Sequence, residues 1–191
     1  MKEDQIKEWI EGILVGDKES FQSLYKATCE DVYRTVGFLI IDKQDIDDVV
    51  NEVYIAMWKS ISKYDTNRSF RFWLHGLIVR QTQDWRRKAW RRFRILERKK
   101  AFRQESSYID EERILHKEMQ SELMQYVVAL SNKHREIIIL RYYHDYSLDA
   151  ISILLNIPIG TVKSRLHTAL KKLRNKLEHA KIIEVGEING C

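Results

Sequence analysis

A single proline, Pro158, occurs in the 191 residues of the chain, together with only seven glycines. Turns between β-strands draw heavily on these two residue types, so a chain this poor in them does not suit a β-sandwich or a β-barrel. Hydrophobic residues make up 44% and charged residues 32%, which supplies a core and excludes a disordered tail. We therefore expect an all-α protein with short connections between its helices.

Apolar residues recur at helical spacing in segments that predict two small domains. Helices are expected over 20–40, over 45–61 and from about Phe70 to Arg92, and Ser131 is expected to cap a helix in the second half. The predicted division is a first domain at 1–93, a linker with helical parts at 94–114, a second domain at 115–178 and a tail at 179–191.

Charge is distributed unevenly along the chain. Residues 1–66 carry a net charge of −6, and residues 104–191 have a net charge of zero. Residues 67–103 hold 13 Lys and Arg against 2 Asp and Glu, a net charge of +11. This division suggests one surface for a polyanion and another for a basic partner, rather than charges scattered for solubility.

Several classes of protein do not fit the sequence. The two cysteines, Cys29 and Cys191, form no C-x-x-C pair, which favours a reducing, cytoplasmic setting. The first residues lack the order of a signal peptide, and no apolar run reaches the roughly 18 residues that cross a bilayer. We find no phosphate-binding loop, nucleophile elbow or zinc-ligand spacing. We therefore expect no enzyme activity, cofactor, metal or small-molecule substrate.

The segment 147–174 has the layout of two helices that meet at a tight turn. Ser147 is the expected N-cap of a helix over Leu148–Leu155, and Asn156 tolerates the left-handed conformation that commonly ends a helix. Pro158 cannot continue the first helix but can begin a second. This order predicts a helix-turn-helix, whose second helix enters the major groove of DNA.

The last helix separates into two faces at about 100° per residue. The packing face holds Val162, Leu166, Ala169, Leu170, Leu173 and Leu177. The opposite face holds Lys163, Ser164, His167, Thr168, Lys171 and Arg174. Lys and Arg contact phosphates or guanine edges, and Ser and Thr bond to either. An ordinary surface helix has the same two faces, so the prediction of DNA binding depends on the preceding turn as well.

The basic segment 67–103 also holds seven aromatic residues. Aromatic rings stack on unpaired bases while Arg and Lys neutralise phosphates, a combination that suits melted nucleic acid. Trp73 is interpreted as a core residue. For Trp85 and Trp90, which lie among arginines, stacking and core packing both remain open.

The helix over 45–61 carries an acidic face opposite its apolar one. A solvated charged face is the commonest reason for such a pattern. Here, however, an apolar residue lies among the acids, as in many docking surfaces. The face consists of Asp45, Asp48, Asn51, Glu52 and Ile55.

Three segments resemble motifs of bacterial sigma factors of the sigma-70 family, in its extracytoplasmic-function (ECF) group. The family's acidic polymerase-docking motif is similar to DIDDVVNEVY at 45–54. Its promoter-melting and −10 segment is similar to SFRFWLHGLI at 69–78 and DWRR at 84–87. Its −35-reading helix-turn-helix is similar to SLDAISILLNIPIGTVKSRLHTALKKLR at 147–174. The resemblance spans about residues 20–178 and implies a sigma factor that binds core RNA polymerase, recognises both promoter elements and promotes melting.

The resemblance also implies roles for individual residues. The acidic face defined above would bind the basic β′ clamp helices, with Asn51 where the family usually has Gln. The −10 element would be held by Tyr64, Asn67, Arg68 and Ser69 in a loop that captures a flipped base, and by Arg80, Asp84, Arg87 and Lys88. The −35 element would be contacted by Thr161, Lys163, Ser164, Arg165, His167, Thr168 and Lys171. Arg80 replaces a common Asn, and Thr168 replaces a frequent Arg.

Further partners implied by the resemblance are the β flap of the polymerase and an anti-sigma factor. The rival hypothesis is a helix-turn-helix regulator that binds DNA without polymerase. This rival explains 147–174 but neither the acidic face nor the basic segment 67–103.

Overall fold

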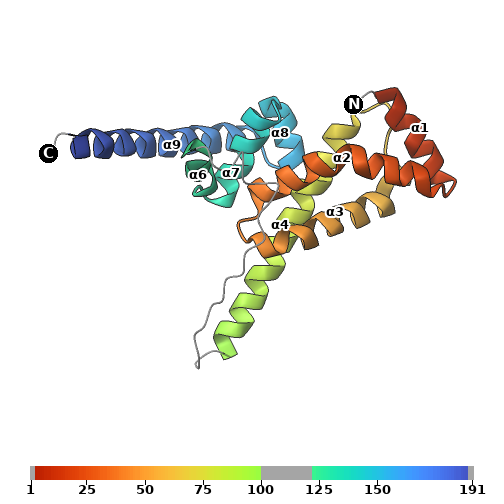
Figure 1. Cartoon of the computed structure of the whole chain (residues 1–191), viewed down its shortest axis with the longest axis horizontal. Coiled ribbons are helices and arrows are strands. Elements are labelled where there is room, and N and C mark those ends of the chain that lie inside the picture. The colour runs from red at the N-terminus through yellow and green to blue at the C-terminus, as the bar shows by residue number, and fades with distance from the viewer. Residues whose placement is uncertain (1–2, 100–121, 189–191) are drawn as a thin grey trace. The chain divides into compact units, whose positions relative to one another are not determined.

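The computed structural model describes residues 3–99 and 122–188, and all the regular elements in these ranges are helices (Figure 1). This confirms the predicted all-α class. The chain forms two compact units, Met1–Glu112 (unit 1) and Arg113–Cys191 (unit 2). Unit 1 contains α1 (Glu3–Leu14), α2 (Lys18–Leu39), the 3₁₀ turns η1 (Lys43–Asp45) and η2 (Ile61–Lys63), α3 (Ile46–Ser60) and α4 (Phe70–Lys99). Unit 2 contains α6 (Glu122–Val128), α7 (Asn132–Ile138), the π-helical turn η3 (Ile139–Tyr143), α8 (Leu148–Leu155) and α9 (Ile159–Ile188).

Helices α1 and α2 form a hairpin at the start of unit 1 (Figure 1). The connection turns at Gly16, whose φ of 88° is accessible to glycine without a steric penalty. Asp17 caps α2, because its carboxylate accepts the backbone N–H groups of Glu19 and Ser20 at 3.0 and 3.1 Å. The isoleucines that hold α1 on α2 recur at helical spacing and are Ile6, Ile10 and Ile13. This first helix is not among the elements expected from the sequence.

Helices α2, α3 and α4 share one apolar core. Their buried side chains include Leu24, Val32, Val36, Val49, Val53, Met57, Phe70, Leu74 and Ile78. A buried hydrogen bond of 3.0 Å joins Thr28 on α2 to the hydroxyl of Tyr54 on α3. The backbone carbonyl of Leu24 accepts the Thr28 hydroxyl at 2.7 Å. The core therefore fixes α3 against α2, and with it the face of α3 that points away from the core.

Helix α4 begins after Ser69, whose hydroxyl accepts the N–H of Phe72 at 3.4 Å. It continues to Lys99, beyond the expected end near Arg92. Between Gly76 and Lys99 no glycine or proline interrupts the helix, and its final turns consist mostly of good helix formers, so helical propensity extends to Lys99. The first part of the expected linker is thus helical, while its remainder, 100–114, lies outside the described residues.

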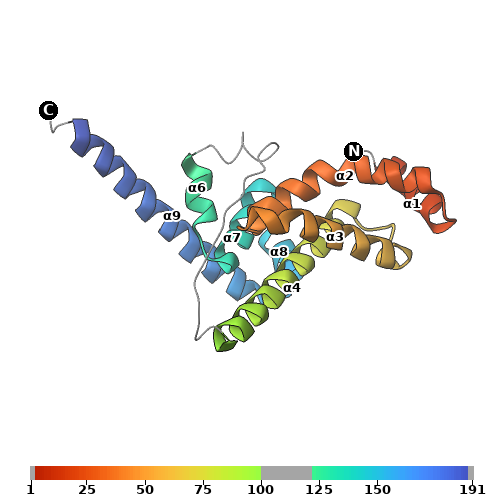
Figure 2. The same cartoon turned by 60° about the horizontal axis from the view of Figure 1, so that its bottom comes forward.

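Unit 2 packs α6, α7 and α8 against the first half of α9. Ser131 occupies the N-cap position of α7 as expected, but its hydroxyl pairs with Nδ1 of His134 at 2.9 Å and caps no backbone N–H. The π-helical turn after α7 was not anticipated. Helix α9 continues through the expected tail to Ile188, and both views of the ribbon show its end projecting from the unit (Figures 1 and 2).

Candidate protein and nucleic-acid interfaces

The five residues of the acidic face lie together on the outer side of α3. The opposite side of this helix is buried through Val49, Val53 and Met57. The side chains of Asp48 and Asn51 are exposed, and Ile55 exposes 45% of its surface among them. Asp45 stands at the N-cap position of α3 but makes no side-chain capping bond. The arrangement leaves carboxylates and one apolar side chain available to a basic partner.

Asp47 differs from its neighbours on this helix. Partial burial, followed by a hydrogen bond and the negative charge of Asp47, raises the pKa of the Tyr33 phenol to about 12. Tyr33 belongs to α2, so Asp47 is directed back toward the body of the unit. Asp47 is exposed like Asp48 but is engaged with Tyr33, whereas Asp45 and Glu52 of the acidic face are half-buried.

The loop between α3 and α4 is ordered by Asp65. Its Oδ1 accepts the backbone N–H and the side-chain amide of Asn67 at 3.0 and 3.1 Å, and its Oδ2 lies 3.4 Å from Nε of Arg68. The N–H of Asn67 lowers the pKa of the Asp65 carboxyl. The phenol of Tyr64 donates to the carbonyl of Arg68 and closes the turn. Asp65 is not among the predicted site residues, yet it positions two of them, Asn67 and Arg68.

An aromatic cluster lies beneath this loop. The Tyr64 ring centroid is 5.6 Å from that of Phe70 and 5.0 Å from that of Trp73, and the last two are 5.5 Å apart. Phe70 is buried, whereas Tyr64 and Trp73 are half-buried. The rings fix the loop to the first turn of α4 and present a partly exposed aromatic edge beside it.

A polar contact that the sequence did not predict holds α4 on α2. Nε2 of the buried His75 lies 2.8 Å from the Asp31 carboxylate, and Nε of Arg71 lies 3.7 Å from the same oxygen. Asp31 and His75 are 44 positions apart, so no local spacing could have indicated this pair. The contact sets the position of α4, and hence of its candidate DNA-binding residues.

The middle of α4 carries the other candidate −10 residues. Arg80, Arg87 and Lys88 are exposed, and Arg87 forms an ion pair with Asp84 one turn before it. The two tryptophans that the sequence left open, Trp85 and Trp90, differ in environment.

Trp85 is half-buried, with the guanidinium carbon of Arg92 5.4 Å from its ring centroid. Trp90 has 61% of its surface exposed. The cation–π contact uses one face of the Trp85 ring. Trp90 is therefore the more accessible of the two for stacking.

Helices α8 and α9 form the predicted helix-turn-helix. Ser147 caps α8 by accepting the N–H of Ala150 at 3.1 Å. Asn156 ends α8 in the left-handed conformation, with φ of 51° and ψ of 52°. The carbonyl of Pro158 then accepts the N–H groups of Thr161 and Val162 at 2.8 and 3.1 Å, which starts α9. The local signals read from the sequence are those that build this turn.

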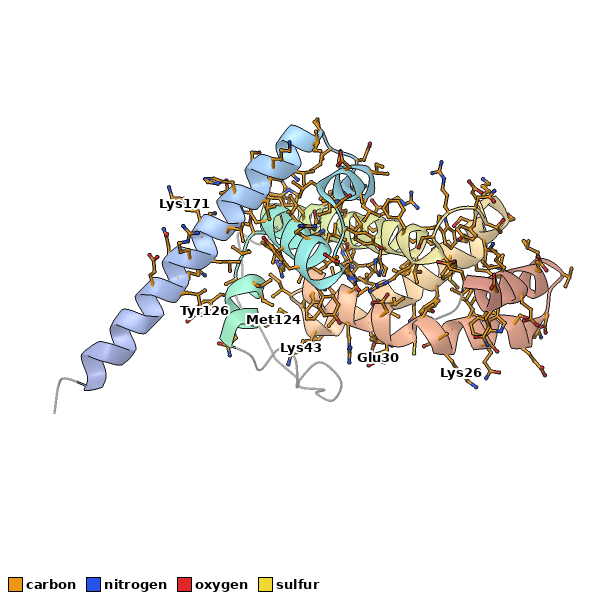
Figure 3. All side chains as sticks on the ribbon, turned by 90° about the horizontal axis from the view of Figure 1, so that it is seen from above. Lys26, Glu30, Lys43, Met124, Tyr126 and Lys171 are labelled. Carbon is orange, nitrogen blue, oxygen red and sulfur yellow. The ribbon has the colours of Figure 1, made fainter. Side chains whose placement is uncertain are left out.

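The outer face of α9 carries the candidate −35 residues. Those with exposed side chains are Lys163, Ser164, His167, Thr168 and Lys171, whereas Thr161 and Arg165 are half-buried. Figure 3 shows Lys171 on the side of α9 away from α6.

The two hydroxyls on this face have a defined polarity. Ser164 donates to the carbonyl of Thr161 at 3.0 Å, and Thr168 donates to the carbonyl of Ser164 at 2.9 Å. Each hydroxyl proton is thereby used within the helix. The oxygens remain able to accept hydrogen bonds, such as those that adenine and cytosine amino groups offer in the major groove.

Within 3–99 and 122–188, no helix combines the length and the apolar character needed to span a membrane.

Both units match models of known families. The model of sigma-70 region 2 matches residues 24–92, and that of sigma-70 region 4 matches residues 127–175. The ECF RNA polymerase sigma factor SigW of Bacillus subtilis is 26% identical over 183 residues, which are 92% of this chain and 98% of that protein. The ECF RNA polymerase sigma factor SigL of Mycobacterium tuberculosis is 30% identical over 175 residues, 88% of this chain and 95% of that protein.

A solved structure has the same fold. It is the sigma factor RpoE from Bartonella quintana, in complex with the anti-sigma factor NepR. The TM-score is 0.65 at 20% sequence identity, and the match covers 84% of this chain and 98% of that one.

Proposed function

Because the chain belongs to the ECF group of the sigma-70 family, we propose which of its surfaces bind core RNA polymerase and which bind promoter DNA. It is an RNA polymerase sigma factor, a non-enzymatic subunit that joins core polymerase to promoter DNA at initiation. The observation that carries this function is the presence of a region 2 unit and a region 4 helix-turn-helix in one chain, in the family's order. The chemistry of RNA synthesis belongs to the polymerase.

Core polymerase is bound through the acidic face of α3, whose partner is the basic surface of the β′ clamp helices. Asp48 and Glu52 are one turn apart and give the face its charge, while the exposed Ile55 supplies an apolar centre. Such a patch, with apolar contact inside a charged rim, combines affinity with electrostatic steering. Unit 2 makes the second contact, with the β flap.

A charge-reversal pair tests the docking face. Asp48→Arg with Glu52→Arg is expected to abolish capture of core polymerase on an affinity resin that carries the chain. The matched control is Asp4→Arg with Glu8→Arg on α1, which reverses two exposed acids at the same spacing, again starting in the first turn of a helix. Equal capture by both variants would contradict this assignment.

The −10 element is held by the loop over 64–69 and by α4. A base that flips out of the stack costs a few kcal/mol, and stacking and pocket contacts offset this cost. The loop is already ordered by Asp65 and by the aromatic cluster, so little conformational entropy is lost when a base enters it. Arg80, Asp84, Arg87 and Lys88 line the adjoining helix.

The −35 element is read by the outer face of α9 in the major groove. Lys163 donates to phosphates or to guanine edges, and Ser164 and Thr168 accept from base amino groups. His167 and Lys171 extend the same face along the helix. The half-buried Thr161 and Arg165 complete the contact at its border.

Lys163→Ala is expected to weaken initiation by about 1–3 kcal/mol, or roughly 5- to 150-fold, on promoters that contain the −35 element. Lys172→Ala is the control, since nine residues at about 100° place Lys172 on the opposite side of α9. Run-off transcription compares both variants on templates with and without the element. An equal loss on both templates would argue against base reading by Lys163.

We also propose that the protein works in the cytoplasm, where promoter DNA lies, under the control of an anti-sigma factor. The similar RpoE chain is solved with such a partner. The rival hypothesis of a polymerase-independent regulator explains α8 and α9 alone. It does not explain why residues 24–92 match sigma-70 region 2.

A further inference from the structure

The second half of α4 extends beyond the body of unit 1. Figures 1 and 2 show this part of the helix projecting past α2 and α3. Thr82 is the last residue of α4 that is buried among those whose side chains are described. The region 2 match ends at residue 92, whereas the helix continues to Lys99. For the described side chains beyond Thr82, packing therefore does not explain why the helix continues or what the exposed ones bind.

Four arginines form a straight stripe along this helix. At about 100° per residue, Arg80, Arg87, Arg91 and Arg94 fall within an arc of about 60°. All four are exposed. At about 1.5 Å per residue the stripe is about 21 Å long, whereas phosphates along one DNA strand recur at about 3.4 Å. The stripe is therefore long enough to follow the backbone over several nucleotides.

The distal end of the stripe carries positive charge that the described acidic side chains of α4 do not neutralise. Asp84 is the one acid of α4 with a described side chain, and it pairs with Arg87. Nε of Arg91 donates to the carbonyl of Arg87 at 3.3 Å, which directs the side chain along the stripe and leaves its terminal amino groups for a ligand. Arg94 lies about one turn further on.

The charge and shape of the stripe favour the backbone of duplex DNA as its partner. Arginine donors suit phosphate oxygens, and all four positions of the stripe are arginine, with the exposed Trp90 on the neighbouring face of the helix. Arg80 and Arg87, at its proximal end, belong to the proposed −10 surface. From there the stripe leads away from the loop over 64–69, where a separated base is held. Given the −10 assignment, we infer that the DNA along this direction is the paired DNA that leads to the −35 element.

We propose that Arg91 and Arg94 grip the phosphate backbone of the duplex spacer just upstream of the −10 element, without reading its sequence. The proposal rests on the −10 assignment made above. These phosphate contacts fix the position of the spacer DNA on the protein. The −35 helix-turn-helix and the −10 loop can then bind one promoter at the same time. Phosphate contacts position a protein on DNA, while base contacts specify the site.

The salt dependence of promoter binding by the complete holoenzyme tests the proposal. A plot of log K against log salt has a negative slope, and its magnitude decreases by about 0.9 for each phosphate that the protein no longer neutralises. Arg91→Gln with Arg94→Gln is therefore expected to reduce the slope by about 1.8. Between 50 and 200 mM salt, wild-type affinity then drops about 12-fold more than that of the variant. Replacing the base pairs of the spacer leaves this difference unchanged.

Two matched variants serve as controls for charge. Arg91→Lys with Arg94→Lys keeps the charge on the stripe and is expected to retain the wild-type slope. Lys7→Gln with Lys26→Gln removes the same charge from exposed positions on α1 and α2 and is also expected to retain it. In Figure 3, Lys26 lies on the side of α2 away from α4.

A second template locates the contact. On DNA that lacks the duplex upstream of the −10 element, the Gln variant and the wild type are expected to bind equally. An unchanged slope on the full promoter, or an equal loss on the shortened template, would overturn the spacer contact. Failure of the wild-type holoenzyme to bind any promoter would instead overturn the proposed function, so the two failures are distinguishable.

Discussion

The hydrogen bond between Thr28 and Tyr54 predicts which of two single substitutions costs more stability. The answer depends on which residue donates the proton. The Thr28 hydroxyl has one proton, and the carbonyl of Leu24, 2.7 Å away, can only accept it. The Tyr54 hydroxyl, 3.0 Å from Thr28 Oγ1, is therefore the donor. Both groups are buried, with exposed fractions of 1% for Thr28 and 6% for Tyr54. Burial also raises the pKa of the Tyr54 phenol.

This polarity makes the two single substitutions unequal. Tyr54→Phe removes a donor while Thr28 keeps its bond to Leu24, so the cost is about 0.5–1.5 kcal/mol. Thr28→Val leaves the buried Tyr54 hydroxyl without its acceptor, which costs about 1–3 kcal/mol. In the Thr28→Val background, Tyr54→Phe removes the stranded hydroxyl and is expected to cost almost nothing. The two substitutions should therefore be coupled by about 1 kcal/mol.

Tryptophan fluorescence measures this cycle in unit 1 alone. All five tryptophans of the chain belong to this unit: Trp9, Trp58, Trp73, Trp85 and Trp90. Urea unfolding followed by this signal gives the free energy of unfolding for each variant. Tyr25→Phe, which removes a more exposed hydroxyl from the ring next to Tyr54, is the control and should shift stability by less than about 0.5 kcal/mol. Additive effects in the double variant would refute the interaction, and a cost of Tyr54→Phe equal to or above that of Thr28→Val would refute the assigned donor.

Three further outcomes test the fold. Gly12→Ala places a Cβ 2.8 Å from that of Ser20 and is expected to destabilise unit 1 by about 1–3 kcal/mol in the same fluorescence assay, with partial recovery on adding Ser20→Gly. Asn156→Gly should leave −35-dependent transcription intact, whereas Asn156→Val, strained by about 1–2 kcal/mol in the left-handed conformation, should reduce it. Burial and then the charge of Lys172 lower the pKa of His134 below 6.5, so the unfolded state binds more protons. Unit 2 should therefore lose stability as the pH falls through 6.5 toward the lowered native pKa, as followed by circular dichroism, and His134→Gln should remove this dependence.

Features with local causes could be predicted from the sequence. The turn between α8 and α9 is determined by Ser147, Asn156 and Pro158, each of which acts on its own backbone or that of the next few residues. The outer face of α3 follows in the same way from helical periodicity. These signals require no knowledge of tertiary contacts, so the helix-turn-helix and the acidic face could be identified in advance.

Features that depend on tertiary contacts or on competition between local signals could not be predicted. The contact of Asp31 with His75 joins residues that only folding brings together. Ser131 was expected to cap α7, but His134 captures its hydroxyl, a choice that depends on side-chain geometry within the folded unit. The length of α4 was underestimated because core periodicity ends before helical propensity does. The site residues themselves remain predictions that the mutants above test.

Initiation by core polymerase at defined promoters is the activity that a sigma factor must confer. The purified chain is added to core polymerase that lacks other sigma factors, and run-off transcripts are mapped on a library of promoter fragments. The account predicts transcripts with defined start sites that require the chain and share −35 and −10 sequences upstream. Transcripts that start without the chain, or none at defined sites with it, while a known sigma factor activates the same core polymerase, would contradict the account.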